Sequence, residues 1–277
     1  PYTRGTKPVR DGLGWNIASM HIEQDPEAAN SAILEDLEGG VNVIVLHVGG
    51  PGLPATKEAL DRALKDVMLD VCPIGLVSFE QTFDAAVALN AVWIGRGIPE
   101  DKRCGSFGAD PLGTLALQGY LSEPVETALA RAVALTQMTL KLPRVSALTA
   151  DAVGYHVAGA SEAQELACML ATLVAYLRAC EEGGIAPKDA LPKISVALAA
   201  DADEFSTIAK LRAARRLVWR VADACGAGEA AASVRFASPT SYRMMAKRDP
   251  WTNILRTTIA CTGAALGGAD SICVLPF

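Results

Sequence analysis

The three histidines are the side chains of this sequence best suited to acid–base chemistry, because an imidazole titrates near neutral pH. They stand at positions 21, 47 and 156, without an H-x-H or H-x-x-x-H pair, so the spacing does not favour a hydrolytic metal centre. His156 is the strongest candidate, since it follows Tyr155 and precedes a Gly159-Ala160 turn, where an imidazole could polarise a carbonyl. The alternative for each histidine is a structural role within the fold.

Other polar side chains stand where predicted strands end, and none of them is a lysine. A Schiff-base aldolase therefore has no evident nucleophile in this sequence. Acids, hydroxyls and one arginine remain as candidates for binding or catalysis. They are Ser19, Glu23, Ser78, Glu80, Asp151, Asp201, Asp203, Ser238, Thr240, Ser241 and Arg243.

The elements that would position these side chains alternate regularly. Eight short apolar runs recur, with an amphipathic stretch between each pair, which predicts parallel strands with helices packed outside. Eight such repeats in 277 residues predict an α/β fold, the (β/α)₈ or TIM barrel, whose functional groups gather at the C-terminal ends of its strands. The predicted strands are 14–20, 41–48, 72–79, 103–109, 146–153, 193–200, 232–238 and 270–275.

The sequence stops just as the predicted eighth strand finishes, at Phe277. A barrel of this class normally adds one more helix after that strand. We therefore expect a single barrel domain over 1–277, truncated after its eighth strand and belonging to a longer polypeptide.

Capping residues predict where several helices begin. Asp25 before Pro26 predicts a helix over 27–37, and Asp249 before Pro250 predicts one reaching about 266. Two short helices are predicted at 112–117 and 123–140.

Two long helices have their own signals. Ser161 and Gln164 have the spacing of a capping box ahead of an apolar helix that runs to about 180. Asp203 is expected to begin the next helix, whose basic residues are predicted to form a solvated stripe. These residues are Lys210, Arg212, Arg215 and Arg216.

The composition limits the classes of partner. The net charge is −6 and no basic run is present, which argues against nucleic acid or an anionic membrane surface. The seven cysteines are scattered without a C-x-x-C pair, as expected in a reducing compartment. No signal peptide or membrane-spanning run is expected, so a soluble protein of the cytoplasm or of an organelle matrix is predicted, with the cytoplasm favoured.

Several segments resemble the substrate-barrel domain of the methylmalonyl-CoA mutase family, which uses adenosylcobalamin. Tyr155-His156 with Gly159-Ala160 is similar to the family's Y-H-x-x-G-A turn, whose histidine contacts the thioester carbonyl. Residues 1–5 resemble its P-F-T-R-G segment, and 209–215 matches A-K-L-R-A-A-R. The stretch from Thr240-Ser241 to Thr258 resembles the segment between the seventh and eighth strands.

Finer matches favour the small, non-catalytic subunit of the two-subunit bacterial enzymes. They include G-A-D-P-L-G at 108–113, A-Q-E-L at 163–166, M-M-A-K-R-D-P-W at 244–251 and the last eleven residues, 267–277.

Departures from the catalytic pattern favour the same subunit. Residues 6–13 lack the aromatic residue that catalytic members carry there, and Pro239 replaces a glutamine before Thr240. The glutamine and arginine that hold substrate near the fourth strand find no counterpart around 103–110. The cobalt-ligating D-x-H-x-x-G signature is absent.

The resemblance therefore implies a barrel that supports a large catalytic subunit in a heterodimer. That subunit would interconvert methylmalonyl-CoA and succinyl-CoA with adenosylcobalamin, a radical isomerase chemistry supplied by the cofactor. No cofactor is expected on this chain alone, and acyl-CoA would bind this chain only weakly or only through the partner. One alternative is a catalytic barrel for a variant acyl-CoA, with cobalamin held by a separate chain, and a lyase unrelated to cobalamin is a third.

The resemblance also implies particular site residues. His156 occupies the catalytic position and is expected to be vestigial, while Tyr155, Thr240 and Ser241 occupy substrate-binding positions. No cofactor-binding or metal-binding residue is implied. In a non-catalytic barrel, the His156 ring should be buried or bonded to groups such as Asp151 or Asp201.

Overall fold

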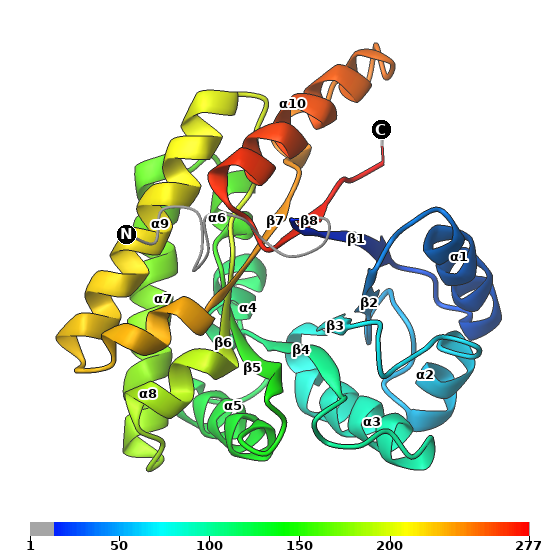
Figure 1. The fold of residues 1–277 in the computed structure, drawn as a ribbon, viewed down its shortest axis with the longest axis vertical. Helices are drawn as coiled ribbons and strands as arrows, with labels where there is room; N and C mark the ends of the chain where they lie inside the picture. The colour runs from blue at the N-terminus through cyan, green and yellow to red at the C-terminus, as the bar shows by residue number, and fades with distance from the viewer. Residues whose placement is uncertain (1–13, 277) are drawn as a thin grey trace. The chain divides into compact units, whose positions relative to one another are not determined.

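The computed structural model describes residues 14–276 and shows eight strands that follow one another in order and close into a barrel (Figure 1). Every pairing between neighbouring strands given by the register is parallel. The predicted (β/α)₈ class is thus confirmed, and the strands lie where the apolar runs predicted them. They are β1 (Asn16–His21), β2 (Val43–His47), β3 (Ile74–Val77), β4 (Cys104–Ala109), β5 (Arg144–Asp151), β6 (Ile194–Ala197), β7 (Arg235–Pro239) and β8 (Ser271–Cys273).

Within this topology the chain forms two compact units. One covers Ile17–Thr149, and the other joins Asn16 to the chain from Ala150 onward. The 1–5 segment and the 6–13 stretch singled out in the sequence lie outside the described residues.

The Ile17–Thr149 unit packs its helices against β1 to β4. Ile44, Leu46 and Ile74 are fully or almost fully buried between the strands and these helices. Gly105 is required in β4, because its φ is +144° and a Cβ there would lie 1.9 Å from the Ile74 carbonyl oxygen. The helices are α1 (Pro26–Glu38), α2 (Lys57–Ala63), α3 (Thr82–Gly95), α4 (Pro111–Gln118) and α5 (Val125–Thr139), with a 3₁₀ turn η1 (Phe79–Gln81).

The unit from Ala150 onward places longer helices beside β6, β7 and β8. The helices over Glu204–Ala224 and Thr252–Gly267 pack closely because Gly263 and Gly267 present no side chain, and a Cβ at Gly267 would lie 2.8 Å from Leu211. The helices are α6 (Val153–Val157), α7 (Glu162–Glu182), α8 (Pro187–Ala190), α9 (Glu204–Ala224) and α10 (Thr252–Gly267), with 3₁₀ turns η2 (Leu191–Lys193), η3 (Gly228–Ser233) and η4 (Tyr242–Met244).

The predicted caps are confirmed for three helices. Asp25 accepts the Ala28 N–H at the start of α1, and Asp203 accepts the Ser206 N–H at the start of α9. Ser161 forms the full capping box with Gln164. The predicted start of α10 was wrong, because the helix begins at Thr252. The Thr252 hydroxyl donates to the Asp249 carboxylate, which is a contact between side chains and does not cap the helix backbone.

The predicted absence of any stretch apolar enough to span a bilayer was also wrong. Among the described residues, α7 has the length and the mean hydropathy, 1.2, to meet that criterion. Its buried face explains the composition, since Met169, Leu173 and Tyr176 are nearly inaccessible inside their unit. A core helix satisfies the same criterion as a membrane span.

The predicted solvated stripe of α9 is a further correction. Lys210 and Arg215 are buried, at 2% and 6% exposure, whereas Arg216 is exposed. Both buried residues share the helix face of Thr207, Leu211 and Ala214, at the three- and four-residue spacing of an inward-facing side. The reason is that each finds an anionic or carbonyl partner inside the unit.

Candidate functional site

His156 lies at the C-terminal end of β5, where a short turn leads directly into α6. Asp151 Oδ1, at the end of the strand, accepts the Val153 N–H at 2.8 Å and so starts the helix. The Ala152 N–H donates to the Ala197 carbonyl of β6 at 3.0 Å. These bonds fix α6 against the strand ends, and His156 becomes fully buried.

The imidazole of His156 meets a polar group at each of its nitrogens. Nε2 lies 2.7 Å from the Ser241 hydroxyl oxygen and 3.4 Å from Asp201 Oδ2. Nδ1 lies 3.4 Å from Glu165 Oε2, outside hydrogen-bond geometry. The buried arrangement expected for a non-catalytic barrel, including the contact with Asp201, is the one found.

Glu165 is held by two further groups besides the imidazole. Lys210 Nζ, from α9, lies 2.5 Å from Glu165 Oε2, and both side chains are buried. Glu165 Oε1 accepts the Ala199 N–H at 2.7 Å, just beyond β6. The carboxylate therefore joins α7, α9 and the end of β6.

Arg243 closes the other side of the cluster. Its Nη1 donates to the His156 and Ala160 carbonyl oxygens at 2.9 and 3.0 Å, and its Nη2 lies 3.5 Å from Asp201 Oδ2. The Arg243 N–H also donates to the Ser241 hydroxyl oxygen. The turn after β7 thus binds the α6 region in two ways. Arg243 bonds the His156 and Ala160 carbonyl oxygens, and Ser241 bonds the His156 imidazole.

Two carboxyl groups near the imidazole have shifted pKa values in opposite directions. Burial raises the pKa of Asp151 to about 6. The charge of Glu165 adds to this rise, whereas the hydrogen bond from the Val153 N–H opposes it. Burial also acts to raise the pKa of Glu165, but the His156 ring and Lys210 favour its charged form and hold that pKa below its usual value. Of Asp151 and Glu165, Glu165 is therefore the one whose surroundings favour the ionised form.

Ser241, His156 and Glu165 stand in the order of a serine–histidine–acid triad. A nucleophilic role would need an accessible hydroxyl, whereas Ser241 is 1% exposed and His156 is fully buried. The negative charge of Glu165 is moreover balanced by the ammonium group of Lys210. As placed, the group is a buried polar cluster in which Ser241 bonds His156 of α6, Lys210 of α9 bonds Glu165 of α7, and the imidazole lies against that carboxylate.

The positions predicted to bind substrate are placed differently from one another. Ser241 contacts the imidazole through its hydroxyl. Thr240 is also buried, but its hydroxyl accepts the Leu275 N–H at 2.9 Å beyond β8. Tyr155 is half-buried on α6, next to His156 in sequence. The structure brings Ser241 and His156 together and directs Thr240 to the end of β8.

The other two histidines belong to the Ile17–Thr149 unit. His21 is buried, and its Nε2 lies 2.9 Å from the Ser19 hydroxyl and 3.3 Å from Asp36 Oδ2, which agrees with the predicted structural alternative. Burial lowers its pKa, although Glu23 and Asp36 oppose that shift. Burial also lowers the pKa of His47, whose ring meets Phe79 edge-on at 6.2 Å.

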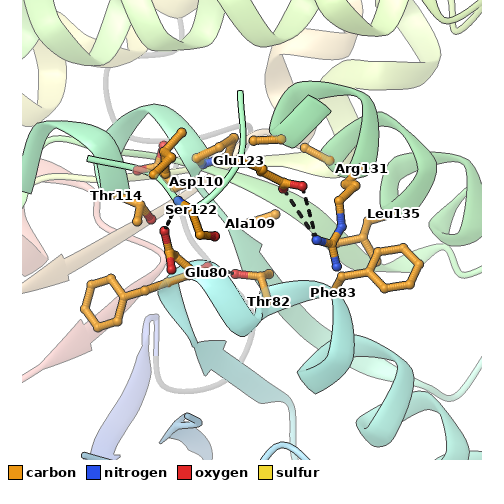
Figure 2. A pocket seen from close by; sticks show the side chains of 15 residues that line it. Glu80, Thr82, Phe83, Ala109, Asp110, Thr114, Ser122, Glu123, Arg131 and Leu135 are labelled. Atoms are coloured by element: carbon orange, nitrogen blue, oxygen red, sulfur yellow. Dashed lines mark hydrogen bonds and ion pairs between the residues drawn. The ribbon is translucent and has the colours of Figure 1, made fainter. Parts of the chain in front are cut away.

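A small pocket opens at the C-terminal ends of β3 and β4 in the same unit (Figure 2). Glu80 accepts the Ser122 N–H at 2.6 Å on one side, and Arg131 lies 3.4 Å from Glu123 on the other. About 50 Å³ is accessible to water-sized groups, room for roughly three waters. The pocket is too small for an acyl-CoA. Across residues 14–276, no three His, Cys, Asp or Glu side chains are grouped to hold a metal ion.

Comparison with known proteins identifies the family. The family model described as methylmalonyl-CoA mutase matches residues 46–277. The chain belongs to the methylmalonyl-CoA mutase family. It is 44% identical to the "Methylmalonyl-CoA mutase small subunit" of Streptomyces virginiae, over all of this chain and 44% of the relative. It is 37% identical to the same-named protein of Propionibacterium freudenreichii subsp. shermanii, over all of this chain and 43% of that protein.

Similarity to the Escherichia coli protein named simply "Methylmalonyl-CoA mutase" is lower. The identity is 29% over 74% of this chain and 30% of that protein. The chain spans less than half the length of these curated relatives. Membership of the mutase family confirms the resemblance inferred from the sequence motifs.

Sequence reasoning within this mutase-family barrel missed Glu165 and Lys210 as partners of the His156 cluster. A signal was present for each. Glu165 is an acid on the face of α7 that also carries Met169 and Thr172, and Lys210 lies on the inward face of α9. Charged residues on an inward helix face are seldom buried without a partner. The helical spacing of Glu165 and Lys210 therefore gave a reason to expect that they pair.

Proposed function

We propose that this chain is the barrel domain of a methylmalonyl-CoA mutase small subunit, which supports a large subunit that interconverts methylmalonyl-CoA and succinyl-CoA. The observation that carries the proposal is the 44% identity to a small subunit over the whole chain, against 29% to the Escherichia coli mutase. In this proposal the domain is one part of a longer polypeptide and the heterodimer works in the cytoplasm. The absence of disulfides among the seven cysteines is compatible with that location.

The buried state of His156 supports a non-catalytic barrel. A histidine that polarises a substrate carbonyl must reach it within about 3 Å. Here Ser241, Asp201 and Glu165 surround the imidazole. His156 thus has partners inside its own unit, and we assign it a vestigial role, with Tyr155, Thr240 and Ser241 at positions that no longer hold substrate.

The described residues do not fit a cobalamin-ligating site. None of His21, His47 and His156 has the aspartate two residues earlier that the D-x-H-x-x-G signature needs, and His21 and His156 are buried with Nε2 against Ser19 and Ser241. No step is therefore assigned to adenosylcobalamin on this chain. We propose that other parts of the assembled enzyme hold it.

A catalytic barrel for a variant acyl-CoA is the second candidate. Its support is the position of His156 at the end of β5, beside the half-buried Tyr155. For that function, α6 would have to release the imidazole from Ser241 and Arg243 to meet a thioester carbonyl. The two candidates predict different results when the full-length protein is tested alone.

The test uses the full-length small subunit and a separately purified large subunit. We expect the small subunit alone to give no saturable change in the cobalamin absorption spectrum and no turnover of methylmalonyl-CoA. Mixing the two should give a 1:1 complex by light scattering and raise the thermal stability of the large subunit. Micromolar or tighter cobalamin binding by the small subunit alone, or no complex, would overturn the proposal.

A further inference from the structure

The small pocket of the Ile17–Thr149 unit is not used by the proposed function (Figure 2). Parts of η1, α3, α4 and α5 surround it, together with the segment that joins α4 to α5. Its apolar lining includes Ala109, Ala132 and Leu135, while carboxylates, hydroxyls and a guanidinium supply the polar lining. The pocket therefore offers an apolar wall and polar groups to the same ligand.

Thr114, in the first turn of α4, is the observation that points to a ligand. Only 5% of its surface is exposed, and it lines the pocket. Within residues 14–276 its hydroxyl forms no hydrogen bond. A desolvated hydroxyl without a partner costs free energy, so buried hydroxyls are normally bonded to protein, water or ligand. The Thr114 hydroxyl is therefore available to a bound group.

Glu80 supplies a carboxylate on the side of the pocket where Thr114 lies (Figure 2). Its Oε1 accepts the Ser122 N–H at 2.6 Å, which holds the side chain across to the segment before α5. In the described part of the chain, no cation forms an ion pair with Glu80. The charge of this carboxylate is thus left for a ligand to balance.

The lining as a whole carries an excess of acids. Among the described residues it holds three carboxylates, Glu80, Asp110 and Glu123, and one cation, Arg131. Arg131 Nη1 lies 3.4 Å from both Glu123 oxygens, so these two charges face each other. The negative charge that remains lies with Glu80 and Asp110 and favours a cationic ligand.

The backbone just before Glu80 is strained. Phe79 has a φ of +43°, in the left-handed region that residues other than glycine rarely adopt. The Thr82 hydroxyl donates to the Phe79 carbonyl oxygen at 2.5 Å and helps to hold the turn. Strain of this kind is often found in segments that clamp a ligand, and here it lies next to the carboxylate that lines the pocket.

We infer that this pocket binds the ammonium group of a small primary amine. An ammonium group presents three N–H donors, for which the Glu80 carboxylate and the Thr114 hydroxyl are acceptors. A short alkyl group would lie against Ala109 and Ala132. About 50 Å³ is accessible to water-sized groups, room for roughly three waters, so the ligand has about three to five non-hydrogen atoms.

A metal ion or an anion fits the pocket less well. Across residues 14–276, no three His, Cys, Asp or Glu side chains are grouped to hold a metal ion, and the excess of carboxylates repels an anion. The inference goes beyond the proposed function and does not depend on it, because the groups that recognise the amine all belong to the Ile17–Thr149 unit.

The test measures binding to the full-length small subunit by titration calorimetry and by the shift in melting temperature. The probes are ethylamine and glycine, with acetate and potassium chloride at the same ionic strength as controls. Ethylamine should bind with a Kd of about 1 mM or tighter and raise the melting temperature, whereas acetate and potassium chloride should do neither. Binding of glycine as well would identify the ligand as a small amino acid, and binding of ethylamine alone would identify a simple amine.

Two variants connect the binding to this pocket. Glu80→Gln keeps an acceptor for the Ser122 N–H but removes the charge, and it should weaken ethylamine binding by about tenfold or more. Thr114→Val removes the hydroxyl without changing the shape, and it should weaken binding by about threefold or more while leaving the melting temperature of the unliganded protein unchanged or higher. The matched control is Glu58→Gln, at an exposed carboxylate of α2 outside the pocket, which should bind ethylamine like wild type.

Saturable binding that is weakened in Glu80→Gln and Thr114→Val but not in Glu58→Gln supports the inference. The inference is overturned if wild type binds neither amine, or if potassium chloride reproduces the shift in melting temperature. It is equally overturned if Glu80→Gln and Glu58→Gln bind ethylamine alike, and Thr114→Val decides the matter if Glu80→Gln does not fold. None of these results bears on the proposed function, which is tested by complex formation with the large subunit.

Discussion

Lys210 Nζ lies 2.5 Å from Glu165 Oε2 in an ion pair from which water is excluded, since both side chains are buried. The pair joins α9 to α7, 45 residues apart in sequence. Through the Ala199 N–H, Glu165 also holds the chain just after β6. His156 lies against the same carboxylate, so the geometry of the cluster depends on this pair.

Removing one partner of this pair should be strongly destabilising. Lys210→Met leaves the charge of Glu165 buried without its cation, which should cost about 3–5 kcal/mol of unfolding free energy. The double variant Glu165→Gln, Lys210→Met keeps an acceptor for the Ala199 N–H and should recover most of the loss. Urea denaturation measures both.

The control for that experiment is an ion pair of the same unit at the surface. Arg220 lies 3.2 Å from Asp223 and is 73% exposed. Arg220→Met should change the unfolding free energy by less than about 1 kcal/mol. Equal losses for Arg220→Met and Lys210→Met would show that burial of the Glu165 pair has no energetic consequence.

The raised pKa of Asp151 predicts a pH-dependent stability. Its folded pKa is about 6, above the ordinary 3.8, so the folded state binds this proton more tightly than the unfolded state does. The contribution of Asp151 is therefore favourable at low pH and is lost as pH rises through about 4 to 6. Asp151→Asn removes the ionisation and can still accept the Val153 N–H.

We expect Asp151→Asn to be more stable than wild type at pH 7–8, by about 1–3 kcal/mol, and the difference to narrow below pH 4. Urea denaturation across the pH range measures this difference. A variant less stable than wild type at pH 8 would mean that ionised Asp151 is stabilised by the fold.

His156→Ala tests whether the buried imidazole has a catalytic role. In the assembled two-subunit enzyme, turnover should stay within about fivefold of wild type, because the ring is fully buried and its Nε2 lies 2.7 Å from the Ser241 hydroxyl. The unfolding free energy should fall by roughly 1–3 kcal/mol, since Ser241 loses its partner. A hundredfold loss of turnover, about 2.7 kcal/mol, would instead favour the catalytic barrel.

Arg215 should be structurally important although it belongs to a run of basic residues. Its guanidinium donates to the Gly268 carbonyl at 2.6 Å and to Asp270 at 2.9 Å, and it lies 4.3 Å from the centroid of the Phe236 ring. Arg215→Lys loses the planar, multiple-donor geometry and should cost about 1–3 kcal/mol, measured by thermal and urea unfolding. Arg216→Lys is the matched control at the exposed neighbour and should lie within about 0.5 kcal/mol of wild type.

The sequence alone was enough for the elements and the family of this protein. The apolar runs gave the eight strands, and Asp25, Ser161 and Asp203 gave three helix starts, because a capping side chain bonds the backbone only a few residues away. The motif around Tyr155-His156 led to the mutase family, since such motifs are contiguous. These features depend on interactions between residues that are close together in the sequence.

Only the tertiary structure decided which side chains meet and which are exposed. Ser241 contacts His156 across 85 residues, and Lys210 contacts Glu165 across 45, because parallel strands and packed helices bring distant segments together. A run of basic residues looks the same in sequence whether it is solvated or buried. Lys210 and Arg215 are buried because Lys210 bonds the Glu165 carboxylate and Arg215 bonds the Gly268 carbonyl oxygen inside the unit. The energy of a buried charge is set by its three-dimensional neighbours, which local sequence does not contain.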